Sequence, residues 1–202
     1  MHFWAQSDSD PGLAVVLIWV AIMAGGILIY YLGRRGERKH LRTLAQELGG
    51  EFVSNFLKGG YLSLRKAEVE LRVRLVPRTR YTPPYLVVEQ MRPLDFRLRV
   101  EVKVPWYKRQ TFFFDLLKKF TLGDPKFDEA HQVRTNDPTR AAYLLNDGRR
   151  REALANLFQH GFTTFLADKK TVQMKMPNYK DVDLSATKVR EYLEKLQAIT
   201  AL

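Results

Sequence analysis

The feature that most constrains this chain is a run of twenty residues without a charged side chain at positions 13–32, LAVVLIWVAIMAGGILIYYL. A helix of that length rises about 30 Å, which matches the hydrocarbon core of a bilayer. Helices that are apolar on every side are unusual inside a domain of this size. The run therefore predicts a membrane-spanning helix.

The charges on the two sides of this run predict its direction. The preceding tail holds only Asp8 and Asp10, whereas a basic cluster follows at Arg34, Arg35, Arg38, Lys39 and Arg42. Because basic residues favour the cytoplasmic side, we expect the N-terminus outside and the rest of the chain in the cytoplasm. A cleaved signal peptide would begin with basic residues and carry a shorter apolar stretch. We therefore expect a permanent single-span anchor.

Small residues within the run suggest a place where another helix could approach. Ala21 and Gly25 are four positions apart, and Gly26 follows directly. Pairs of this kind allow close packing of helices in membranes. They are also common by chance, so we treat this as a secondary prediction.

We expect four segments along the chain: a tail (1–12), the membrane helix (13–33), a basic helix next to the membrane (34–50) and one α+β domain (51–202). Apolar residues at Leu41, Leu44, Ala45 and Leu48 have helical spacing, and two glycines end that run. The basic cluster on this helix is placed to meet anionic lipid.

Alternating apolar and charged residues predict an antiparallel sheet with one apolar and one charged face. We expect one hairpin from residues 61–64 and 69–75, and another from 162–166 and 171–176. We expect a strand at 96–104 with 85–91 as its neighbour.

Helical signals are clearest near the C-terminus, where Val189, Tyr192, Leu193, Leu196 and Ile199 share one face. Asp137 followed by Pro138 predicts a helix start, and a further helix is expected after Gly148. We expect a short helix at 111–120, although its three consecutive phenylalanines also fit a strand. Residues 127–135 are predicted to be extended.

The chain is strongly basic, with 33 Lys and Arg against 22 Asp and Glu and a net charge of +11. Such a surface attracts phosphates on lipids or nucleic acids, or acidic proteins. A basic strand face is predicted from Arg72, Arg74, Arg97 and Arg99. Acidic residues interrupt these arginines as in ordinary cross-strand ion pairs, so a solvated face is the alternative and nucleic acid is not expected.

The sequence carries no recognisable catalytic, metal or cofactor motif. It has no cysteine and four scattered histidines, and it lacks the glycine-rich and nucleophile patterns of common enzymes. Asp124, Asp128 and Glu129 could share acid and base roles or bind a cation. Turn and backbone roles explain the same residues more simply. We therefore expect no catalytic residue, no cofactor and no metal.

The segment GDPKFD at 123–128, followed by VRTND at 133–137, resembles a pattern in uncharacterised bacterial membrane-anchored proteins. The resemblance implies a bacterial inner-membrane setting and a shared architecture. That family supplies no activity to transfer.

These features favour a membrane-tethered, non-enzymatic interaction domain, an accessory subunit of a larger membrane assembly with other proteins as partners. Two alternatives stay open. One is a basic module that contacts anionic lipid or nucleic acid, and the other is a membrane-bound hydrolase.

Overall fold

The computed structural model describes residues 11–54, 60–66, 68–92, 94–103 and 117–201. The chain divides into two compact units, Met1–Lys39 and His40–Leu202. The predicted tail at 1–12, the end of the strand predicted at 96–104 and most of the helix predicted at 111–120 lie at least partly outside the described residues.

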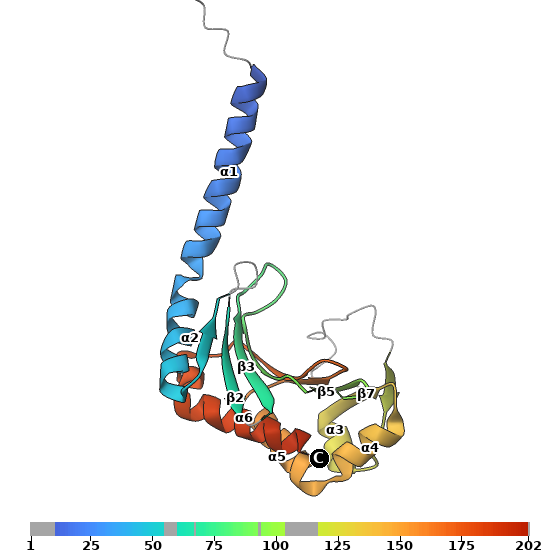
Figure 1. Cartoon of the computed structure of the whole chain (residues 1–202). Helices are drawn as coiled ribbons and strands as arrows, with labels where there is room; N and C mark the ends of the chain where they lie inside the picture. Colours follow the sequence, from blue (N-terminus) through green and yellow to red (C-terminus); the bar gives the residue numbers. More distant parts are fainter. Residues whose placement is uncertain (1–10, 55–59, 67, 93, 104–116, 202) are drawn as a thin grey trace, which may run out of the picture. The chain divides into compact units, whose positions relative to one another are not determined.

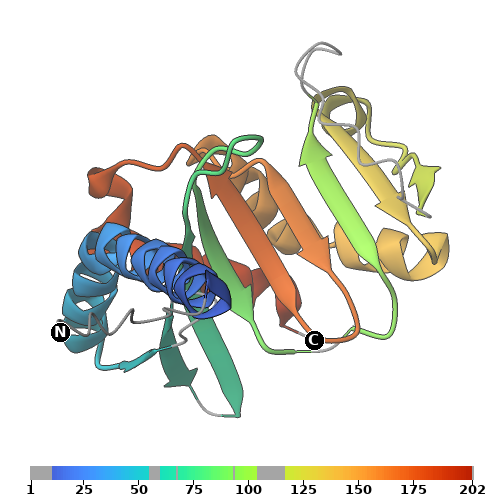
Figure 2. The ribbon, with the colours of Figure 1, turned by 90° about the horizontal axis from the view of Figure 1, so that it is seen from above.

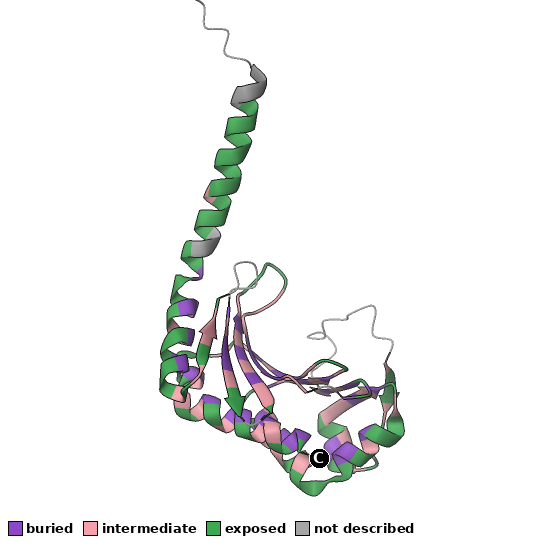
Figure 3. Cartoon of the chain, viewed as in Figure 1, coloured by how far each residue is buried: buried purple, intermediate pink, exposed green. Residues whose placement is uncertain are grey.

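The first unit contains helix α1 (Pro11–Gly33). Its large apolar side chains are exposed, with Trp19 at 63% and Ile29 at 73% (Figure 3). The residues predicted to pack against another helix have no such neighbour in the described chain, since a Cβ at Gly25 or Gly26 would meet no atom within 4 Å.

The prediction of a membrane-spanning helix is corrected by this structure. Among the described residues, no helix is both long and apolar enough to cross a membrane. The single-span anchor and the inner-membrane location with the N-terminus outside, which depended on such a helix, are therefore not supported.

Helix α2 (Arg35–Leu48) begins in the first unit and ends in the second. Its predicted apolar stripe is confirmed, because Leu41, Leu44 and Ala45 are buried in the core of the second unit. The helix closes with a Schellman motif: the N–H of Gly49 donates to the Gln46 carbonyl, and the N–H of Gly50 donates to the Ala45 carbonyl.

Nine strands of the described chain form one antiparallel sheet, in the order β1-β2-β3-β4-β9-β8-β5-β7-β6. The strands are β1 (Glu51–Val53), β2 (Tyr61–Lys66), β3 (Val69–Val76), β4 (Tyr85–Gln90), β5 (Leu98–Val102), β6 (Lys118–Phe120), β7 (His131–Thr135), β8 (Thr164–Ala167) and β9 (Val172–Pro177). Both predicted hairpins are confirmed, as β2 pairs with β3 and β8 pairs with β9.

Helices cover one face of this sheet (Figures 1 and 2). They are α3 (Pro125–Ala130), α4 (Pro138–Asn146), α5 (Gly148–Gln159), the 3-10 turn η2 (Asp181–Leu184) and α6 (Ala186–Thr200). The five predicted apolar positions of α6 are all buried, and with α4 and α5 they pack on inward residues such as Val100, Phe165 and Met174. The α+β class and the antiparallel sheet are thus confirmed.

Three local predictions are wrong. The strand at 96–104 was expected beside 85–91, but β5 pairs with β7 and β8, while β4 pairs with β3 and β9. Of residues 127–135, all predicted to be extended, His131–Thr135 forms β7 as expected, but the first four belong to α3 (Pro125–Ala130), because Asp124 caps that turn. Lys118–Phe120 is a strand, since it pairs with β7 at the sheet edge.

Candidate functional site

The face of the sheet opposite the helices carries mostly polar side chains, which come from all the central strands. The strand register places side chains from different strands in two rows on this face. One row holds Ser63, Arg72, Glu89, Gln173, Leu166, Arg99, Arg134 and Lys119, and the other holds Arg74, Val87, Lys175, Thr164, Glu101 and Gln132. We call this surface the open face. No described helix of the second unit lies over it (Figure 2).

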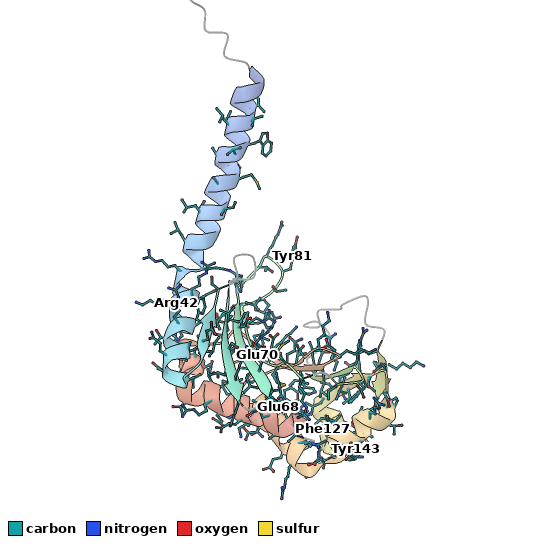
Figure 4. All side chains as sticks on the ribbon, viewed as in Figure 1. Arg42, Glu68, Glu70, Tyr81, Phe127 and Tyr143 are labelled. Carbon is teal, nitrogen blue, oxygen red and sulfur yellow. The ribbon has the colours of Figure 1, made fainter. Side chains whose placement is uncertain are left out.

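Three glutamates on the open face pair with three arginines. Arg72 donates from Nε and Nη2 to the two carboxylate oxygens of Glu70 at 2.9 Å each (Glu70 is labelled in Figure 4), and the Ser63 hydroxyl donates to the same carboxylate at 2.8 Å. Arg74 binds both oxygens of Glu89 in the same way. The hydrogen bonds from Arg72 and Ser63, with the positive charge of Arg72, hold the pKa of Glu70 below its usual value.

The third ion pair on the open face joins Arg99 and Glu101, and Lys175 lies near the centre of the face. Arg99 donates to Glu101 at 2.6 Å. Lys175 lies between these pairs on β9, and its ammonium group makes no hydrogen bond or ion pair with any residue in the described ranges. Burial lowers the pKa of Lys175, and the nearby charges of Arg74 and Arg99 lower it further. The open face therefore contains a half-buried cation that has no counter-ion of its own among the described residues.

The structure brings together most of the basic face predicted from sequence. Arg72, Arg74 and Arg99 share the open face, whereas Arg97 is exposed just before β5 and its N–H donates to the Asn136 side chain at 2.7 Å. Sequence analysis missed Lys175. Its alternation with Val172, Met174 and Met176 in the last hairpin was the signal that could have placed it on the charged side.

The basic cluster after α1 divides by exposure. Arg34 and Arg38 are buried, at 8% and 7%. Arg35, Lys39 and Arg42 are exposed, and the Arg42 guanidinium lies 5.2 Å from the centre of the Phe52 ring. The cluster is therefore not one uniformly exposed charged surface.

The GDPKFD segment uses its acidic side chains to bind backbone amides. The Asp124 carboxylate accepts from the N–H groups of Lys126 and Phe127 and caps α3, and it also pairs with Arg151 at 3.0 Å. Asp128 accepts from the N–H groups of Leu122 at 3.0 Å and Gly123 at 2.8 Å. These contacts give both residues a structural role in folding the segment.

We expect Asp128→Ala to destabilise the protein by about 1–2 kcal/mol, because it removes the acceptor of two backbone N–H groups. Urea unfolding followed by circular dichroism measures the change. Glu129→Ala is the matched control, since Glu129 is the exposed neighbouring acid, and should change stability by less than about 0.5 kcal/mol. Equal effects of the two substitutions would contradict the structural role of Asp128.

His131 lies beside this segment between two phenylalanine rings. Its ring centre is 4.5 Å from that of Phe127 and 4.8 Å from that of Phe158, and Nδ1 is 3.1 Å from the Phe127 carbonyl oxygen. Burial is the main cause that lowers the pKa of His131 from 6.5, opposed by that backbone hydrogen bond. The folded protein thus favours the neutral imidazole.

This shift predicts a loss of stability in mild acid. Below pH 6.5, the ordinary pKa, the unfolded chain binds a proton that the folded chain resists, so the free energy of unfolding falls until the folded pKa is passed. His131→Gln should remove this component, while His40→Gln should keep it. Unfolding curves from pH 8 to pH 5 test this, and parallel pH profiles for wild type and His131→Gln would refute it.

The described residues contain no group of three or more His, Asp or Glu side chains that could hold a metal ion. His160 contacts a single carboxylate and an aromatic ring: it lies 3.1 Å from Glu191, and its ring packs edge-on against Tyr192. The arrangement on the open face, by contrast, can bind anions, because the Lys175 ammonium group has no ion-pair partner in the part of the chain that the structure describes.

Comparison with known proteins gives a likeness at the level of the fold. No protein-family profile and no curated protein matches the sequence. The structure is similar to the crystal structure of the mycobacterial trehalose monomycolate transport factor A, TtfA, with a TM-score of 0.53 at 12% sequence identity. The match covers 81% of this chain and 96% of that chain. The two proteins therefore share an architecture over nearly the whole of the solved one.

Proposed function

We propose that this chain is a non-enzymatic accessory protein of a lipid-transport system, which acts by binding other components. The observation that carries the proposal is the fold that it shares with TtfA, a transport factor, over 96% of that chain. The open face supports it, since a broad polar sheet surface suits contact with a partner better than enclosure of a small substrate.

The proposal is tested in the organism that encodes the chain. Deleting the gene should slow the delivery of newly made, pulse-labelled lipid to the cell envelope, and expressing the wild-type chain should restore it. Unchanged lipid delivery in the deletion strain would contradict the proposal. Turnover of ester or phosphoester substrates by the purified chain would instead favour a hydrolase.

Photo-crosslinking can locate the partner-binding side. Tyr81, in the loop between β3 and β4, and Tyr143, on α4, are highly exposed at 78% and 73%, and Figure 4 shows them on different parts of the second unit. A photoreactive phenylalanine analogue at position 81 should capture a transport component, whereas the same analogue at position 143 serves as the control. Equal capture from both positions would argue against binding through the sheet side.

A second candidate function, contact with an anionic ligand, is favoured by the uncompensated charge of Lys175.

A further inference from the structure

We propose that the open face holds a binding site for a phosphate group, centred on the Lys175 ammonium group. This inference goes beyond the accessory function and does not depend on it, because it rests on the geometry and charges of the sheet.

The position of Lys175 sets the site in the middle of the sheet. β9 is the fifth strand in the sheet order, and Lys175 lies directly opposite Val87 on β4 and Thr164 on β8. Directly opposed side chains have Cβ atoms about 5 Å apart. The Thr164 hydroxyl is therefore within reach of an oxyanion bound at Lys175. The buried, apolar side chain of Val87 lies on the other side of Lys175, on β4.

Two arginines flank Lys175, and Arg74 retains a hydrogen-bond donor. Arg74 uses Nε and Nη2 on Glu89, which leaves Nη1 without a bond to any residue that the structure describes. Arg99 lies beyond β8, and its Nη2 is bound to Glu101. Charge-assisted bonds from such groups to phosphate are the strong ones in proteins.

The surrounding charges explain why an anion is favoured at this point. Burial and the positive charges of Arg74 and Arg99 both act against the charged form of Lys175, and Glu89 and Glu101 offset this only in part because each already pairs with an arginine. A phosphate group would supply the missing negative charge. Its several oxygens match donors that approach from separate strands, which a single carboxylate matches less well.

The test uses the full chain and two probes, inorganic phosphate and short-chain phosphatidylglycerol below its micelle concentration, followed by calorimetry. Binding of phosphatidylglycerol alone would assign the site to a lipid headgroup, and binding of both probes would assign it to phosphate in general. Lys175→Gln should weaken binding at least about tenfold, the loss of one charge-assisted contact. Lys119→Gln is the control, because Lys119 is exposed on the edge strand of the same face.

Stability separates loss of the site from loss of the fold. Lys175→Gln removes a half-buried cation that two arginines oppose, so its thermal midpoint without ligand should equal or exceed that of the wild type. Thr164→Val offers an independent variant of similar shape and should weaken phosphate binding several-fold. The proposal is overturned if the wild type binds neither probe, if Lys175→Gln and Lys119→Gln weaken binding equally, or if Thr164→Val binds like the wild type.

Discussion

Arg74→Met is expected to destabilise the protein by about 3 kcal/mol, because it leaves the Glu89 carboxylate buried without its partner. Glu89 is only 6% exposed, and Arg74 binds both of its oxygens. Removing one member of a buried pair costs far more than the pair contributes, since the remaining charge keeps its desolvation penalty. For a chain of this size the melting temperature should fall by roughly 10 °C.

The neighbouring pair on the same strand provides the control. Arg72→Met makes the same substitution, but Glu70 is 27% exposed and keeps the Ser63 hydroxyl as a donor. Arg72→Met should therefore lower the free energy of unfolding by no more than about 1 kcal/mol. The double variant Arg74→Met, Glu89→Leu should recover most of the stability lost in Arg74→Met. Equal melting temperatures for Arg72→Met and Arg74→Met would show that burial of Glu89 does not govern the cost.

Gly50→Ala should destabilise the protein by about 2–3 kcal/mol through steric overlap. A Cβ at this position would lie 2.6 Å from the Ser63 carbonyl oxygen and 2.5 Å from Leu64 Cδ2. The carbonyl belongs to β2, which pairs with β1, so the backbone itself must move. Urea denaturation should show a lower midpoint with an unchanged slope.

Gly49→Ala is the comparison for Gly50→Ala, because the adjacent glycine is constrained for a different reason. Gly49 has a φ of +70°, but a Cβ there would meet no atom within 4 Å. The cost is then the left-handed conformation alone, about 1 kcal/mol. A larger loss for Gly49→Ala than for Gly50→Ala would show that backbone conformation, and not contact with β2, dominates at this turn.

Elements with strong local signals could be predicted from the sequence. The apolar spacing of α6 is long and regular, and Asp137 accepts from the N–H of Arg140 as the predicted helix cap. The two hairpins join strands that are close in the chain, so alternation and turn residues are sufficient to pair them. The ion pair between Glu191 and Lys195, at 3.6 Å, also follows from spacing along one helix.

Pairing between distant strands could not be predicted in this way. β4 and β9 have six paired positions but are separated by about eighty residues, and β5 is inserted between β7 and β8. The alternation of apolar and polar residues shows which side of a strand is apolar, but it does not show which other strand lies beside it. This is why residues 85–91 were assigned to the wrong partner.

The sequence by itself determined the α+β class, the apolar side of each hairpin, the helical face of α6 and the basic character of the chain. The tertiary structure decided the strand order, and with it the assembly of Arg74, Lys175 and Arg99 on one surface. Local residue patterns depend on the periodicity of a single helix or strand. The environment of Lys175 depends on which strands lie beside β9, and that is fixed by packing of the whole core.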